Sequence, residues 1–268
     1  MSCLKSIFSQ VNQNFEFTIY LIDNGSDGTH EKVSIIFPQV KLILGDNKLY
    51  WAGSMRRIWQ HAINTSINYD YFLLLNDDTI LMNTAFSSLG NDITKLASKE
   101  VILIGSTIDP VTKNISYGGS VLLNNYSTLM KKIIPNNNYP QLCHLGNANI
   151  MLVPTEVVKE IGILSDLYTH GIADYDYTLS ARKRNIPTFI GSKYMGFCEY
   201  DHGNKWWPAK KFTLKQRIKN LYDVKGLAYK EYLMFVKIHF PYYLPQAFIL
   251  LWGKTLFPFL WEKFKKKG

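Results

Sequence analysis

Short apolar runs rich in β-forming residues recur along the first 155 residues, and stretches with helical periodicity separate them. We interpret the runs at 17–22, 40–44, 71–75, 101–105 and 147–153 as strands. Helices are expected after residue 28 and at 52–66, 85–97, 154–162 and 173–184. Strands and helices that alternate at this spacing predict an α/β fold with a mainly parallel central sheet and helices on both of its faces.

Length and composition agree with one sizeable globular unit. The chain has 268 residues, of which 47% are apolar and only 19% charged, so it can bury a large core and is not disordered. Residues 109–140 are polar and Asn-rich, and we expect loops and a small hairpin there. We predict a catalytic domain over 1–205 and a separate helical, basic and aromatic segment over 206–268.

Carboxylates follow two of the predicted strands directly. Asp23 comes after the first run, and Asp77 and Asp78 come one residue after the run YFLLL. Ligands of parallel α/β sheets bind beyond the carboxyl ends of the strands. Carboxylate oxygens there suit Mg²⁺ or Mn²⁺ on a diphosphate. The alternative from these residues alone is that Asp and Asn only form turns and cap helices.

Four sequence blocks resemble, in order and spacing, the family 2 glycosyltransferases. They are DNGSDGT at 23–29, NKLYWAGSM at 47–55, LLLNDDTIL at 73–81 and HGIADYDYTLSARKRN at 170–185. The resemblance covers about 3–202 and is nearest to bacterial rhamnosyl- and galactofuranosyltransferase-like sequences of surface polysaccharide synthesis. It implies the nucleotide-sugar transferase fold called GT-A.

The resemblance also implies which residues bind the donor, a UDP- or dTDP-sugar, and its metal. Asp23 would contact the nucleotide base, with Asn24 and Ser26 in the same loop. Asp78 would bind Mn²⁺ or Mg²⁺, with His202 as a further ligand. Two more donor-site residues would be Asn76, at the position of the usual first aspartate, and Asp77.

Asp174 would be the catalytic base that removes a proton from the acceptor hydroxyl, with Asp176 as the alternative. Gly146 and Asn147 match a loop near the donor sugar and the acceptor, to which we also assign Asp176. The implied activity is an inverting hexosyl- or deoxyhexosyltransferase acting on a glycan or lipid-linked glycan. The alternatives are a catalytically impaired binding or scaffold protein of this fold and, less well supported, a nucleotidyltransferase, because no Gly-rich phosphate loop is visible near the N-terminus.

The last quarter of the chain carries most of the excess positive charge. Lysines and arginines at 205–219 and 263–267 are interleaved with Trp and Phe, a pattern that favours an anionic membrane surface over nucleic acid. The alternative is that this segment packs on its own domain or on a second subunit of an oligomer. Arg56 and Arg57 depart from the family pattern, and we interpret them as surface residues rather than phosphate ligands.

The N-terminus lacks the apolar stretch of a signal peptide, and Cys3, Cys143 and Cys198 are too far apart to suggest a disulfide framework or a zinc site. We therefore expect a cytoplasmic protein at the inner face of the plasma membrane. The segment SCLKSIFSQV at 2–11 is also expected to be a helix, and the family normally has a central strand before it. We expect the natural protein to be longer, and the absent strand puts the activity of this chain in question.

Overall fold

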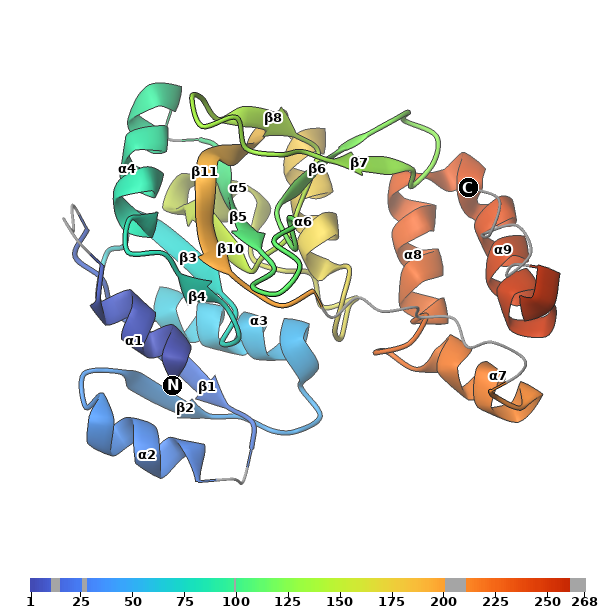
Figure 1. The fold of residues 1–268 in the computed structure, drawn as a ribbon, viewed down its shortest axis with the longest axis horizontal. Helices are drawn as coiled ribbons and strands as arrows, with labels where there is room; N and C mark the ends of the chain where they lie inside the picture. The colour runs from blue at the N-terminus through green and yellow to red at the C-terminus, as the bar shows by residue number, and fades with distance from the viewer. Residues whose placement is uncertain (11–14, 26–27, 99, 201–210, 261–268) are drawn as a thin grey trace.

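The computed structural model describes residues 1–10, 15–25, 28–98, 100–200 and 211–260 (Figure 1). The helices are α1 (Ser2–Phe8), α2 (Thr29–Ile36), α3 (Tyr50–Ile63), α4 (Ala85–Leu96), α5 (Thr155–Ile161), α6 (Ala173–Lys183), α7 (Leu214–Tyr222), α8 (Tyr229–His239), a 3₁₀ turn (Pro241–Tyr243) and α9 (Leu244–Leu256). The strands are β1 (Tyr20–Asp23), β2 (Lys41–Leu44), β3 (Tyr71–Leu75), β4 (Ile80–Leu81), β5 (Ile102–Ile108), β6 (Gly119–Leu122), β7 (Met130–Lys132), β8 (Gln141–Cys143), β9 (Leu145–Gly146), β10 (Ile150–Pro154) and β11 (Thr188–Phe197).

The predicted strands and helices are all present, with ends that differ by up to three residues. The hairpin expected within 109–140 consists of β6 and β7. Strand β6 also pairs with β9, so the three strands form a small sheet. Strands β1 and β2 form a separate parallel pair. The central sheet has the order β3-β10-β5-β11-β4, and β8 adds to β11.

The expectation of a mainly parallel central sheet is wrong. Only β5 and β11 pair in parallel, whereas β10 runs antiparallel to both β3 and β5, and β4 and β8 run antiparallel to β11. Strands β3, β5 and β11 share one direction, as the intervening helices predict. Strand β10 reverses because the small sheet β6-β7-β9, and not a helix, connects it to β5.

Helices cover both faces of the central sheet, as predicted. Alternate residues of each strand point to opposite faces. Ile102 and Ile104 pack with residues of α3, α5, α6 and α8, whereas Leu103 packs with residues of α1 and α4. The two cores lie on opposite faces of the sheet, so the sheet positions the helices of both cores.

The C-terminal helices are anchored in the first of these cores. Phe235 and Val236 of α8 and Ala247 of α9 are buried in it, and Figure 1 shows α7, α8 and α9 gathered on one side of the sheet beyond α6. Asp176 of α6 accepts hydrogen bonds at Oδ1 from the Tyr168 hydroxyl at 2.9 Å and is 2.7 Å from Nε2 of His239, the last residue of α8. The His239 and Asp176 side chains are only 2% and 9% exposed.

We predict that His239→Ala lowers the free energy of unfolding by about 3 kcal/mol, because a buried carboxylate then loses a close partner. Urea denaturation of the full chain measures this. Lys237→Ala, an exposed position on the same helix, is the matched control and should change stability by less than about 0.5 kcal/mol. Equal effects of the two substitutions would contradict a structural link between α6 and α8.

Candidate functional site

Several loops meet at one edge of the central sheet. The carboxyl ends of β3, β5 and β11 lie there together with the amino end of β10, because β10 runs in the opposite direction. The Asn76 N–H, just after β3, donates to the Asn149 carbonyl at 3.3 Å, just before β10. Ligand sites of open α/β sheets form beyond this edge, so the residues in these loops are the candidates for chemistry.

The NDD turn after β3 presents its two carboxylates to solvent. Asp77 and Asp78 are both exposed, whereas the Asn76 side chain is held in place, because its Oδ1 accepts a hydrogen bond from Trp51 Nε1 at 2.7 Å. Cys3 of α1 lies beneath the turn. Burial, reinforced by the negative charge of Asp77 and Asp78, raises the pKa of the Cys3 thiol to about 12, which disfavours its thiolate form.

Asp174 and Asn147 lie next to each other at this edge. Asp174 Oδ2 accepts hydrogen bonds from Asn147 Nδ2 and from the Ala148 N–H, both at 3.3 Å, and its Oδ1 accepts from the Tyr175 N–H at 2.8 Å. Burial raises the pKa of the Asp174 carboxyl above its ordinary value, and these donors act in the opposite direction. A partly buried carboxylate with a raised pKa accepts a proton more readily than an exposed one.

Asp176 occupies the same helical turn but points elsewhere. Residues two apart on a helix lie about 200° apart around its axis. Asp176 is buried against Tyr168 and His239, on the side of α6 that faces the C-terminal helices. Its carboxylate therefore holds α6 in place, and the contacts favour Asp174 as the group that faces Asn147. Gly146, in β9, lies so close to the Ile104 side chain that a Cβ there would clash with it.

The loop after β1 is the second part of the site. Asp23 Oδ1 accepts a hydrogen bond from the Gly25 N–H at 2.9 Å, and Asn24 Nδ2 donates to Ser54 Oγ of α3 at 2.6 Å. Gly45 abuts the Asn24 side chain and leaves no room for a Cβ. The predicted Ser26 and His202 lie outside the residues that the structure describes.

Helix α3 joins the loops through its side chains. Besides the contacts of Trp51 and Ser54, Arg56 Nη1 donates to the Ser165 carbonyl at 2.7 Å and to the Tyr168 carbonyl at 2.8 Å. The interpretation of Arg56 as a surface residue is wrong, because it is half-buried and ties the segment before α6 to α3. The only sequence signal of these Arg56 contacts was that residue 56 departs from the family pattern.

The residues present are compatible with a metal ion that is shared with a diphosphate. Within the described parts of the chain, no group of three or more His, Cys, Asp or Glu side chains could hold a metal by itself. Mg²⁺ and related ions are commonly held by one or two carboxylates, with phosphate oxygens and waters as the other ligands. Asp77 and Asp78 are exposed and could supply that part of a ligand set.

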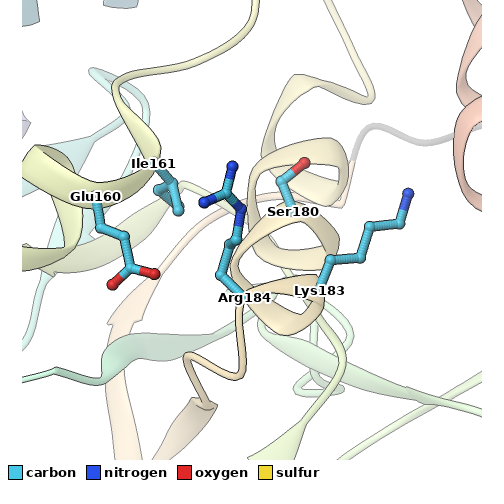
Figure 2. Close-up of a pocket in the computed structure, with 5 residues that line it drawn as sticks. All are labelled: Glu160, Ile161, Ser180, Lys183 and Arg184. Atoms are coloured by element: carbon cyan, nitrogen blue, oxygen red, sulfur yellow. The ribbon is translucent and has the colours of Figure 1, made fainter.

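A shallow cavity of about 260 Å³ lies away from this edge. Figure 2 shows the five side chains that line it, from the end of α5 and from the C-terminal part of α6: Glu160, Ile161, Ser180, Lys183 and Arg184. Asp174 lies at the other end of α6, so this cavity is not part of the candidate site. Among the described helices, none has the length and apolar character needed to cross a bilayer.

Comparisons with known proteins agree on the fold. The chain superimposes on a crystal structure of residues 1–349 of TarS from S. aureus with a TM-score of 0.50 and 13% identity, over 74% of this chain and 56% of that one. It superimposes on GalNAc-T7, crystallised with UDP, GalNAc and Mn²⁺, with a TM-score of 0.57 and 12% identity, over 92% of this chain and 53% of that one. This chain thus spans little more than half the length of either structure.

Both are glycosyltransferases with the GT-A fold, and the predicted GT-A fold is confirmed. No model of a protein family matches the chain, and no curated protein sequence is significantly similar to it. The nearer resemblance to rhamnosyl- and galactofuranosyltransferase-like proteins therefore stays a prediction.

We predict that Asn147→Ala raises the pKa of the Asp174 carboxyl further, because the amide donates a hydrogen bond that stabilises the ionised form. Carboxyl ¹³C shifts followed by NMR from pH 2 to 8, assigned with Asp174→Asn, measure this pKa. Asn64→Ala, an exposed asparagine at the end of α3, should leave it unchanged. A pKa of Asp174 that falls in Asn147→Ala would contradict the assigned contact.

Proposed function

We propose that this protein is a metal-dependent, inverting glycosyltransferase that transfers a sugar from a UDP- or dTDP-sugar to a hydroxyl of a glycan acceptor. One observation carries the proposal. In a GT-A fold, one sheet edge brings together two exposed carboxylates, Asp77 and Asp78, with Asp174, a partly buried carboxylate held by Asn147. Sugar transfer needs a group that helps to neutralise the charge of the leaving diphosphate, and it needs a base that removes the proton of the acceptor hydroxyl.

In this proposal Asp174 is the general base. It removes the proton from the acceptor hydroxyl as that oxygen attacks the anomeric carbon and the bond to the diphosphate breaks. A single displacement of this kind inverts the configuration at that carbon. The raised pKa of Asp174 suits the role, and Asn147 and the Ala148 N–H hold its Oδ2, which leaves the carboxylate oriented when it is ionised.

Asp78, supported by Asp77, would hold Mn²⁺ or Mg²⁺, and His202 is proposed as a further ligand. The metal would neutralise the charge that develops on the departing nucleoside diphosphate. Asp23 and Asn24 follow β1, where the resemblance assigns the nucleotide base, and Ser26 is proposed in the same loop. The UDP and Mn²⁺ in the GalNAc-T7 structure support this class of donor and cofactor.

The acceptor and location are part of the same proposal. We assign the chain to bacterial surface polysaccharide synthesis, as a hexosyl- or deoxyhexosyltransferase that acts on a lipid-linked glycan at the cytoplasmic face of the plasma membrane. An apolar outer surface of the C-terminal segment supports a membrane contact. Its exposed side chains are Tyr242, Phe248, Ile249, Leu256, Phe257, Phe259 and Leu260.

We predict that, with Mn²⁺ and a panel of UDP- and dTDP-sugars, the full chain releases nucleotide, and that Asp174→Asn lowers this rate by about 10²- to 10⁴-fold. UDP binding should be unchanged in Asp174→Asn and weaker in Asp78→Asn. Asp166→Asn, an exposed aspartate, is the matched control and should behave as the wild type.

Full activity of Asp174→Asn would contradict the assigned base. Binding of UDP without turnover of any donor would favour the alternative, a catalytically impaired binding protein. Binding of no nucleotide by calorimetry would contradict the proposed function altogether.

We predict that the full chain floats with vesicles that contain phosphatidylglycerol, and that the double substitution Phe248→Ser/Ile249→Ser lowers the bound fraction at least about tenfold, because two apolar side chains no longer enter the bilayer. The double substitution Val111→Ser/Leu123→Ser changes two exposed apolar residues outside this surface and is the control. Equal flotation of the two double variants would refute the membrane contact.

A further inference from the structure

A lysine and a tyrosine meet beside the candidate site, where the hairpin of β6 and β7 approaches the residues after β11. Lys132, the last residue of β7, places its Nζ 4.5 Å from the centre of the Tyr200 ring and donates a hydrogen bond to the Ser116 carbonyl at 2.6 Å. The Tyr117 ring lies against the Tyr200 ring, with their centres 6.0 Å apart. Tyr117 is buried, whereas Tyr200 is 48% exposed. We call Lys132 and Tyr200 the basic–aromatic pair.

Hydrogen bonds connect the surroundings of this pair to the proposed catalytic base. The Gly118 carbonyl accepts the Asn147 N–H at 3.0 Å, and the Gly118 N–H donates to Asn147 Oδ1 at 3.4 Å. Asn147 Nδ2 in turn donates to Asp174. Residues two apart in a chain are separated by at most about 7 Å, so Ser116 lies close to Gly118. The basic–aromatic pair is therefore within reach of a glycan whose reacting hydroxyl lies at Asp174.

Two further contacts place Tyr200 on the same side of the molecule. Burial raises the pKa of the Tyr175 hydroxyl, and the charges of Asp174 and Tyr200 raise it further, so Tyr175 lies close to both. Asp109 Oδ2 accepts the Tyr200 N–H at 2.8 Å, while its Oδ1 accepts two N–H groups of the turn after β5. These hydrogen bonds hold the pKa of the Asp109 carboxyl at about 2, so the carboxylate stays ionised and fixes the backbone of Tyr200.

We infer that the basic–aromatic pair binds a sugar unit of the acceptor that carries a carboxylate or a phosphate, so that this protein prefers an acidic glycan. An ammonium group has three N–H donors, and the Ser116 carbonyl accepts from only one of those of Lys132. Within the described parts of the chain, no carboxylate forms an ion pair with Lys132. The exposed part of the Tyr200 ring offers an apolar surface to the sugar ring.

The surroundings of the ammonium group support an anionic ligand. Partial burial lowers the pKa of Lys132, because the charged form loses part of its hydration. An anion at this position replaces that lost hydration with charge-assisted hydrogen bonds. The inference rests on the proposed function for the identity of the ligand as the acceptor, but the site can be tested without any sugar donor.

The experiment compares sugars that differ in one group. Glucuronate and galacturonate carry a carboxylate where glucose and galactose carry a hydroxymethyl group, and glucose 6-phosphate carries a phosphate at the same carbon. Each sugar is titrated into the full chain, and the lysine ¹³Cε signals are followed by NMR and assigned with Lys132→Gln. The acidic sugars should shift the Lys132 signal and bind about three- to tenfold more tightly than the neutral ones, between the effects of an exposed ion pair and of a buried charged hydrogen bond.

Variants separate the charge from the ring. Lys132→Gln should remove the preference for acidic sugars, and Lys132→Arg should retain it. Lys131→Gln is the matched control, because the preceding residue of β7 points to the opposite face of its sheet. Tyr200→Ala should weaken the binding of acidic and neutral sugars alike, whereas Tyr200→Phe, which keeps the ring, should bind both as the wild type does.

Binding of the uronates alone would identify the acidic group as a carboxylate, and binding of glucose 6-phosphate alone would identify it as a phosphate. Equal affinity for acidic and neutral sugars, no shift of the Lys132 signal with any acidic sugar, or a preference that persists in Lys132→Gln would overturn the inference. UDP binding in the presence of Mn²⁺ is measured on the same samples. Its absence alone would contradict the proposed function, and UDP binding without a preference for acidic sugars would contradict only this assignment.

Discussion

The antiparallel course of β10 between β3 and β5 determines how the candidate site is assembled. Leu75 at the end of β3 pairs with Ile150 at the start of β10, so the residues that precede β10 lie beside the NDD turn. Asn149 can then accept the Asn76 N–H, and Asn147 reaches Asp174. A parallel β10 would place these asparagines at the opposite edge of the sheet, about the length of a strand away.

Two aspartates in one helical turn have different surroundings, and this difference distinguishes the proposed base, Asp174, from Asp176, which has a structural role. Asp174 faces the sheet edge, where two N–H donors hold one of its oxygens. Asp176 faces the C-terminal helices, where Tyr168 and His239 enclose it. A buried carboxylate is stable only when hydrogen bonds replace its hydration. The direction of α6 therefore depends on residues of α8 that lie more than sixty positions later in the chain.

The sequence predicted the parts of the structure that local pattern determines. Apolar runs identified β3 and β5, and Asn76, Asp77 and Asp78 follow β3 at the sheet edge, as the run YFLLL predicted. It did not predict the direction of β10, because the small sheet that connects β5 to β10 has no strong periodic signal. Nor could it predict that Arg56 binds two carbonyl groups near α6, since a contact between residues more than 100 positions apart leaves no trace in local spacing.

The C-terminal segment combines properties that are difficult to reconcile with a detachable anchor. Phe235 and Val236 belong to the main core, and removal of the segment would expose that core as well as the Asp176 carboxylate. Yet the outer face of α9 is apolar and exposed at Phe248 and Ile249, which a segment that served only to complete the core would not need. A role in both packing and contact with an apolar partner explains both faces. The Asp176–His239 contact also joins α8 to the helical turn that carries Asp174, the proposed base.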